Sequence, residues 1–219
     1  MNKNNILNII KKVRENSKKR KFNQTFDLII NLKNLNLKKP EENINSFITL
    51  PYGRGKKVKV CGLVGLELGN KAKDVCDKVI LKDEFEKLDK KDIKSLAREY
   101  NFFIAQVNLM PDIAKHFGKI LGSRSKMPSP KAGCVVPINA ELKPLYEKLQ
   151  KIVKVETKNE PIVKLAIGNE SMKDEEIAEN ILNFYDTILS LLPQEKNNIK
   201  NVFLKLTMGK PILIGDENV

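Results

Sequence analysis

A chain of 219 residues with 41% hydrophobic residues is long enough to bury one large core or two small ones, which excludes a disordered protein. Its 40 Lys and Arg against 27 Asp and Glu give a formal net charge of +13, and a surplus of this size favours a nucleic-acid partner over a merely solvated surface. Three widely spaced cysteines without C-x-x-C spacing, and no apolar run near the about 18 residues that span a bilayer, argue against a disulfide framework, a zinc site or a membrane protein and favour the cytosol.

The first 54 residues, in which the cationic charge is densest, predict a basic helix and two strands. The helix is indicated by apolar residues that recur at helical spacing, Ile6, Ile9, Ile10 and Val13. Four basic residues follow it at 18–21. Alternating apolar residues from Phe26 to Leu32 predict a strand, and a second strand is expected over 44–50. The residues at 51–55, Pro-Tyr-Gly-Arg-Gly, break this pattern and predict a hinge.

The middle of the chain changes its rhythm to strands that alternate with helices. Strands are expected over 57–64 and 102–107, and helices over 70–79, over 90–100, from Pro111 onward and over 140–150. A loop rich in Ser, Pro and Lys occupies 122–133. This alternation is typical of a parallel sheet that is covered by helices on both faces.

The last third, like the first, predicts antiparallel strands and helices. Strands are expected over 152–157 and 162–167, and the residues between them, Lys158-Asn159-Glu160-Pro161, indicate a hairpin. Ser171 and Asp174 have the spacing of a helix N-cap and its third residue, and a long apolar-faced helix follows. A final strand carries Val202, Leu204 and Leu206. The sequence therefore predicts a mixed α/β fold, with one domain formed by residues 1–54 and 151–219 and a second, residues 55–150, inserted into it.

Two stretches carry side chains that could contact a nucleic acid. Thr207 has a hydroxyl that donates and accepts, as a ribose 2′-hydroxyl does, and Met208 offers an adaptable apolar surface. Gly209 would let a nucleotide backbone approach closely. The alternative for these three residues is a strand end followed by a turn. Phe22, beside Lys21, could stack on a base or ribose, and its alternative is a core residue that opens the strand.

The sequence also leaves an enzyme hypothesis open, in which the middle segment binds a nucleotide. Gly62, Gly65 and Gly69 follow a predicted strand, but their spacing is G-x-x-G-x-x-x-G and not the G-x-G-x-x-G of dinucleotide-binding loops. Cys134 and His116 could be a nucleophile and its base, although no orienting partner is evident. His116 is more simply a partly exposed helix residue. A stand-alone regulator of mRNA is a third hypothesis, and it would use the same RNA-binding surface.

Four stretches in order resemble the family of ribosomal protein number one of the large subunit, which forms the mobile lateral stalk. They are Lys21-Phe22-Asn23-Gln24-Thr25, Leu50-Pro51-Tyr52-Gly53-Arg54-Gly55, residues 120–128 and Leu206-Thr207-Met208-Gly209. Phe102-Phe103-Ile104-Ala105-Gln106 is similar to the archaeal branch. The family's loop usually reads Leu-Gly-Pro-Arg-Gly-Lys-Met-Pro, and here Ser123 and Ser125 replace its Pro and second Gly. A close backbone approach at position 125 is harder without glycine.

The resemblance implies a discontinuous α/β sandwich domain with an inserted, three-layer Rossmann-like α/β domain. It implies a cytoplasmic, ribosome-associated structural protein without catalytic residues, metal, cofactor or membrane contact, which is a monomer off the ribosome. Its expected partners are large-subunit ribosomal RNA, deacylated tRNA leaving the exit site, and its own mRNA, whose translation it would repress. The residues expected to bind RNA are Lys21, Phe22, Thr25, Gly168, Asn169, Lys205, Thr207, Met208 and Gly209.

Overall fold

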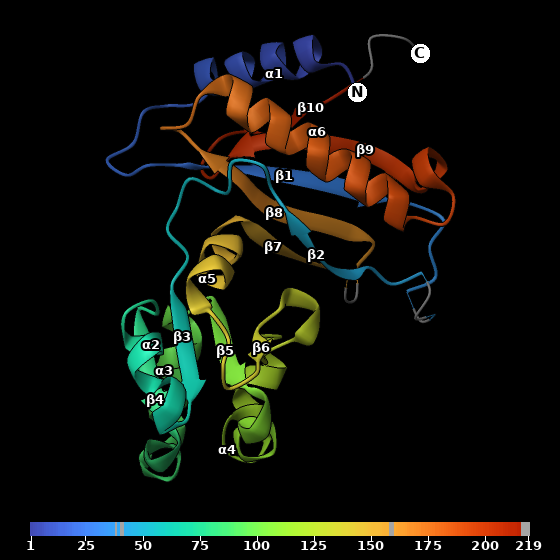
Figure 1. The fold of residues 1–219 in the computed structure, drawn as a ribbon. Helices are drawn as coiled ribbons and strands as arrows, with labels where there is room; N and C mark the ends of the chain where they lie inside the picture. The colour runs from blue at the N-terminus through green and yellow to red at the C-terminus, as the bar shows by residue number, and fades with distance from the viewer. Residues whose placement is uncertain (38, 40–41, 158–159, 216–219) are drawn as a thin grey trace. The chain divides into compact units, whose positions relative to one another are not determined.

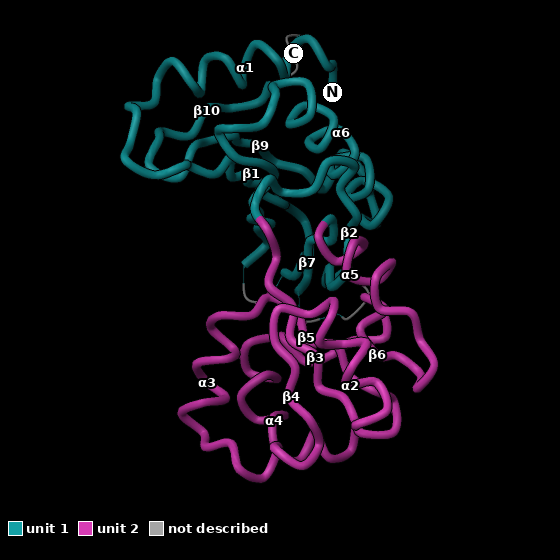
Figure 2. Tube along the Cα trace, turned by 60° about the vertical axis from the view of Figure 1, so that its left-hand side comes forward, with its two compact units in different colours: residues 1–56, 151–219 teal, residues 57–150 magenta. Residues whose placement is uncertain are grey.

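A computed structural model describes residues 1–37, 39, 42–157 and 160–215 of the chain. The expected mixed α/β class is confirmed, because helices accompany both antiparallel and parallel sheets. The chain divides into two compact units (Figure 2): Met1–Lys56 with Lys151–Val219, called here the terminal unit, and Lys57–Gln150, called the inserted unit. In the described part of the chain, no helix has the length and apolarity to cross a membrane.

The terminal unit is built on an antiparallel sheet with the strand order β10-β9-β1-β8. Its strands are β1 (Thr25–Leu32), β8 (Ile162–Asn169), β9 (Ile199–Leu206) and β10 (Ile212–Leu213). Strand β1, from the beginning of the chain, lies between β8 and β9, which come from its end. Hydrogen bonding across this sheet is what joins the two chain segments into one unit.

The remaining strands of the terminal unit form a separate two-stranded antiparallel sheet, β2 (Asn45–Thr49) with β7 (Ile152–Glu156). The predicted hairpin between 152–157 and 162–167 is therefore wrong, because β7 pairs with β2 whereas β8 pairs with β1. Each strand finds its partner in the first segment of the chain, which local turn residues cannot reveal. Of the predicted turn, Lys158 and Asn159 lie outside the described residues.

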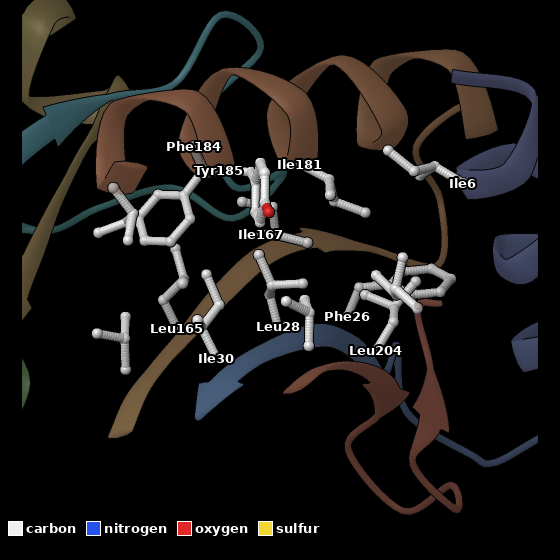
Figure 3. Packing of buried hydrophobic residues seen from close by; sticks show 14 of the residues in the cluster. Ile6, Phe26, Leu28, Ile30, Leu165, Ile167, Ile181, Phe184, Tyr185 and Leu204 are labelled. Carbon is white, nitrogen blue, oxygen red and sulfur yellow. The ribbon is translucent and has the colours of Figure 1, made fainter. Parts of the chain in front are cut away.

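Two helices, α1 (Lys3–Glu15) and α6 (Asp174–Leu191), lie on the same face of the four-stranded sheet (Figure 1). The alternating residues of β1 that the sequence indicated, Phe26, Leu28, Ile30 and Leu32, are buried. Figure 3 shows the first three of them with Ile181 and Phe184 of α6 in one apolar layer. Burying this layer is the main stabilising contribution to the terminal unit.

The start of α6 differs from the predicted cap. The helix begins at Asp174, and the backbone N–H of Lys173 donates to the carboxylate of Glu176 at 3.3 Å. The hydroxyl of Ser171 donates instead to the Asn169 side-chain oxygen at 2.7 Å. Two residues, Met172 and Lys173, thus separate Ser171 from the helix, and it serves the preceding turn rather than the cap.

The inserted unit contains a parallel sheet with the order β4-β3-β5-β6. Its strands are β3 (Val60–Val64), β4 (Lys78–Leu81), β5 (Phe102–Gln106) and β6 (Val135–Val136), and its helices are α2 (Leu66–Lys73), α3 (Lys90–Glu99), α4 (Met110–Ser123) and α5 (Leu142–Lys151). The helix predicted over 70–79 is present but lies earlier in the chain, so only 70–73 of the predicted span is helical. Helix α2 begins after Gly65 and ends at Lys73, and the short apolar run around Ile80 pairs with β3 as a strand.

The loop after α4 carries the Lys-Met-Pro stretch and adopts a fixed shape. Ser125 lies in the left-handed region at φ 55°. The ammonium group of Lys126 turns inward and donates to the backbone carbonyls of Ala97 at 2.9 Å and Tyr100 at 2.7 Å, at the C-terminal end of α3. Because unpaired carbonyls at a helix end need partners, Lys126 acts as a side-chain cap for α3.

Candidate RNA-binding surface

The predicted RNA-binding stretches meet at one end of the four-stranded sheet. Because β1 runs antiparallel to both neighbours, its first residues lie beside the last residues of β8 and β9. Thr25 is paired with Asn169, and Phe26 is paired with Leu206. The β1–β8 register shifts between Phe26 and Asp27, so a bulge adjoins this end. We call the surface formed by Lys21–Thr25 and Leu206–Gly209 the corner.

Thr207 holds the two halves of the corner together. Its backbone N–H donates to the Thr25 carbonyl at 3.0 Å, and its hydroxyl accepts from the Thr25 N–H at 3.1 Å and lies 3.3 Å from the same carbonyl. The hydroxyl therefore extends the β1–β9 pairing by one step. Because its proton is directed at the Thr25 carbonyl, the Thr207 hydroxyl keeps one acceptor position for a ligand. It can therefore accept a hydrogen bond from a ribose hydroxyl but not donate one, whereas the sequence suggested both.

Two large apolar side chains of the corner are exposed. Phe22 is 52% exposed and Met208 is 60% exposed. The alternative that Phe22 opens the strand as a core residue does not fit, since β1 starts at Thr25 and Phe26 is the first core residue of the strand. A ring and a thioether exposed beside cations are suited to contact bases and riboses.

Phe22 lines a hollow of about 430 Å³ whose walls are mostly cationic. The other lining residues are Arg14, Lys19, Arg20, Lys21, Asn23 and Glu170. Lys19, Arg20 and Lys21 are exposed, so their charges are available to phosphate groups. The hollow thus combines an aromatic face with positive charge, as single-stranded and unpaired nucleotides require.

Lys205 lies on β9, directly opposite Asp27 of β1. Burial raises the pKa of Asp27, and the positive charge of Lys205 acts in the opposite direction. The carboxylate offsets part of the charge that Lys205 could direct at RNA, so this lysine is a weaker phosphate ligand than the lysines around Phe22.

Three of the predicted residues make internal contacts. A Cβ on Gly168 would lie 3.1 Å from Ile177 Cγ1 of α6, and one on Gly209 would lie 2.6 Å from Ser17 Oγ. The side chain of Asn169 donates to the Gly55 carbonyl at 2.6 Å and is 9% exposed as a residue. At position 209 a Cβ would require the Ser17 side chain to move, so glycine packs there without rearrangement, and its predicted contact with a nucleotide stays a prediction. Gly168 and Asn169 pack against neighbouring residues of the terminal unit.

Sequence reasoning missed the polar residues that organise this surface, Arg14, Gln24 and Glu170. Gln24 is 1% exposed although it lies in a polar run, and its side-chain oxygen accepts from the Met208 N–H at 3.2 Å. The sequence indicated Arg14 only as one of several basic residues on the first helix. Most of their hydrogen-bond partners, Glu170, Met172, Asp174 and Met208 among them, are more than a hundred residues away in sequence, so no local pattern could have identified them.

The nucleophile hypothesis finds no chemical support. Cys134 is 2% exposed, and burial raises the pKa of its thiol to about 11, so the thiol stays protonated at neutral pH. His116 is a partly exposed residue of α4. Among the described residues, no cluster of three or more His, Cys, Asp or Glu gathers to hold a metal ion.

One glycine of the middle segment serves close packing. A Cβ on Gly69 would lie 3.0 Å from Leu81 Cδ2, so glycine lets α2 approach the parallel sheet closely. A Cβ on Gly62 would contact Cys76 Sγ at 3.5 Å, which is an ordinary van der Waals distance. Close packing thus accounts for Gly69, and the spacing of the three glycines still differs from that of dinucleotide-binding loops.

The amino-acid sequence is similar to one protein family over nearly its whole length. The sequence model of the Ribosomal protein L1p/L10e family matches residues 12–210. A large ribosomal subunit protein uL1 of Methanothermococcus thermolithotrophicus is 42% identical over 216 residues, which cover 98% of this chain and 99% of the relative. The uL1 protein of Nanoarchaeum equitans is 44% identical over 209 residues, covering 94% and 97%. That of Methanocaldococcus jannaschii is 37% identical over 219 residues, covering 99% and 98%.

Proposed function

The chain belongs to the ribosomal protein L1p/L10e family, and we propose that it binds RNA through the corner of the terminal unit and the cationic hollow beside it. As a member of this family it is a structural constituent of the large ribosomal subunit that binds ribosomal RNA. The family is not enzymatic, in agreement with the expectation from the sequence. The proposal concerns which surface makes the contact and what else that surface binds.

One observation carries this assignment. Residues from the two ends of the chain, Phe22 and Met208, expose apolar side chains on a backbone that cross-strand hydrogen bonds hold in place. Phe22 also lines the hollow that contains Lys19, Arg20 and Lys21. Exposed apolar side chains with cations at one end of a sheet are suited to folded RNA, which proteins recognise through stacking, ribose hydroxyls and phosphates. In this proposal the contact residues are Lys21, Phe22, Thr25, Lys205, Thr207 and Met208.

The same surface supports two further partners. Recognition through shape and backbone does not depend strongly on base sequence, so an mRNA segment folded like the ribosomal site would compete for the corner. Binding of its own mRNA would then let the free protein repress translation. On the ribosome, in the cytoplasm, the protein would assist deacylated tRNA in leaving the exit site. The net charge of +13 favours all of these polyanionic partners.

Binding to transcripts tests the proposal. We expect the purified full-length chain to bind a large-subunit ribosomal RNA transcript, with an affinity that falls steeply as salt rises because phosphate contacts release counterions. Thr207→Ala should weaken binding, since it removes a hydroxyl acceptor and loosens Thr25. Parallel titrations with its own mRNA leader and with deacylated tRNA measure the other two partners.

Two results would contradict the assignment. The chain could fail to bind the ribosomal transcript at an ionic strength of about 0.15 M, at which the Debye length is about 8 Å. Alternatively, Lys94→Ala on α3 of the inserted unit could weaken binding as much as Lys21→Ala in the corner. Lys94 is a matched control because it is also an exposed lysine, but in the other unit.

A further inference from the structure

A polar pair joins the corner to the turn after β8: Gln24 of the corner is buried, and Glu170 is partly buried. The backbone N–H of Gln24 donates to one carboxylate oxygen of Glu170 at 2.8 Å, and its side-chain amide donates to the other at 3.2 Å. In return, the backbone N–H of Glu170 donates to the Gln24 carbonyl at 3.0 Å. The two residues are thus bound to each other through main chain and side chains at once.

Gln24 also reaches the other parts of the RNA-binding surface. Its amide nitrogen lies 3.3 Å from the Lys18 carbonyl, in the basic stretch before Phe22, and its amide oxygen accepts from the Met208 N–H at 3.2 Å. The Gln24 side chain is 1% exposed, and both its amide nitrogen and its amide oxygen are hydrogen-bonded. These bonds connect it to three separate chain segments, at Lys18, Glu170 and Met208. Such networks specify a single geometry only when every member is satisfied.

Arg14 fixes the other side of the same loop. Its guanidinium donates to the carbonyls of Glu170 at 2.8 Å and Met172 at 2.9 Å, and to the carboxylate of Asp174 at 2.9 Å. It also lies over the ring of Phe26, 5.1 Å from the ring centroid. Glu170 is consequently held from two directions, and it cannot move toward the lysines of the hollow without breaking these bonds.

We propose that Gln24 and Glu170 are the positioning pair of the RNA-binding surface, which sets the placement of Phe22 relative to Met208. The inference rests on the proposed RNA-binding corner and adds the residues that determine its geometry. Glu170 is an acidic residue in a cationic hollow, where it weakens the attraction for phosphate. Its presence is explained if its carboxylate is required to accept both donors of Gln24.

Charge and positioning predict opposite results for one substitution. Glu170→Gln removes a negative charge from the hollow, so electrostatics alone predicts tighter RNA binding. Positioning predicts weaker binding, because the new amide has one acceptor oxygen where the carboxylate accepted two donors. Its NH2 group must then face either the backbone N–H or the side-chain amide of Gln24 with donor against donor, unless Gln24 turns and presents a donor to the Met208 N–H. The sign of the change therefore separates the two explanations.

The decisive comparison exchanges the two side chains. In Gln24→Glu, two carboxylates face each other, whereas in the double variant Gln24→Glu with Glu170→Gln the amide and carboxylate have changed places. The exchanged pair keeps the net charge and can again accept the Met208 N–H, but a carboxylate oxygen now faces the Lys18 carbonyl, so the long contact to Lys18 becomes repulsive. We expect Glu170→Gln to raise the Kd for the large-subunit ribosomal RNA transcript about tenfold, and the double variant to restore part of the affinity.

The outcomes are distinct. The control Glu179→Gln changes the exposed partner of Lys3 in the same unit and should leave the Kd within about twofold. Equal or tighter binding by Glu170→Gln, or a double variant no better than Glu170→Gln, overturns the positioning role. If Gln24→Glu does not fold, the comparison of Glu170→Gln with the double variant still decides. If the unaltered chain does not bind the transcript, the proposed function fails instead.

Discussion

The corner of the terminal unit and the stretch 120–128 of the inserted unit, which ends α4 and forms the loop after it, both carry family-like motifs, yet they use their side chains in opposite ways. In the corner, apolar Phe22 and Met208 are 52% and 60% exposed. In the loop, charged Lys126 turns inward to two backbone carbonyls, and Pro128 is buried. An exposed apolar group and a partly buried charge are each unfavourable on their own.

The difference indicates what each motif is for. The exposed apolar side chains of the corner contribute little to the fold, so their presence is best explained by a partner that covers them. The inward ammonium group of Lys126 satisfies the end of a helix, so it is explained by the fold alone. Substitutions in the two regions should therefore separate binding from stability.

Replacing Lys126 should give the largest effect, and it should be confined to stability. Lys126→Met keeps the aliphatic stem but leaves the carbonyls of Ala97 and Tyr100 without their donor, which costs about 2–3 kcal/mol. Urea denaturation should show the loss, and hydrogen exchange should locate it in α3 and α4. RNA affinity should stay unchanged.

Lys119→Met is the control for this change, because Lys119 is an exposed residue of α4. It should leave the stability within about 0.5 kcal/mol of the unaltered chain. An equal loss in both variants, or a loss of RNA affinity in Lys126→Met, would mean that the loop is not the structural element inferred from its contacts.

Phe22→Ala should give the reverse result. Loss of a stacking ring should weaken binding of the ribosomal RNA transcript by about 1–3 kcal/mol, while the melting temperature stays unchanged because the ring is exposed. Leu213→Ala is matched to it, since Leu213 is 51% exposed in the same unit but lies on β10. A normal Kd for Phe22→Ala, or a similar loss for Leu213→Ala, would remove Phe22 from the contact set.

The sequence predicted those parts of the molecule that depend on local periodicity. Ile6, Ile9, Ile10 and Val13 are buried in α1 as their spacing indicated, and the alternating residues of β1 all face the core. Strands β6 and β10, of two residues each, are too short to give a period. Pairing was not predictable, because β2 and β7 join residues more than a hundred positions apart.

The candidate site was predictable in the same limited sense. The motif residues Phe22 and Met208 could be found from chemistry and resemblance, and the structure brings them to one end of the sheet. Gly168 and Gly209 had the right residue type for a close approach, but the atoms that approach them belong to the protein. Gln24 was missed because a buried polar residue gives no sign of burial until its partners are known.

Ser125→Gly tests whether backbone strain in the loop after α4 lowers the stability of the inserted unit. Ser125 has φ 55°, a conformation that costs a residue with a side chain about 1–2 kcal/mol, and glycine adopts it without this strain. After the larger entropy loss of glycine on folding is subtracted, we expect a gain of about 0.5–1 kcal/mol. Urea denaturation measures it, and a decrease in stability would show that the contacts of the serine outweigh the backbone strain.

Asp27→Asn should give the smallest effect. It tests whether the negative charge of Asp27, next to the corner, weakens RNA binding by Lys205. Burial raises the pKa of Asp27, so the folded chain binds the proton of this carboxyl more tightly than the unfolded chain does. The protonated group therefore stabilises the fold below pH 3.8, the ordinary pKa of the carboxyl. This contribution is lost as the pH rises through the raised pKa of the folded chain. The half-exposed position reduces the effect to about a few tenths of a kcal/mol.

The variant should therefore be slightly more stable than the unaltered chain at pH 7, and the difference should disappear as the pH falls below 3.8. Melting temperatures measured across this range test the sign. At neutral pH the variant should also bind RNA slightly more tightly, because Lys205 no longer faces a carboxylate. A loss of stability at pH 7 would instead mean that the Asp27–Lys205 attraction exceeds the cost of burying the carboxylate, and that Lys205 belongs to the fold rather than to the RNA-binding surface.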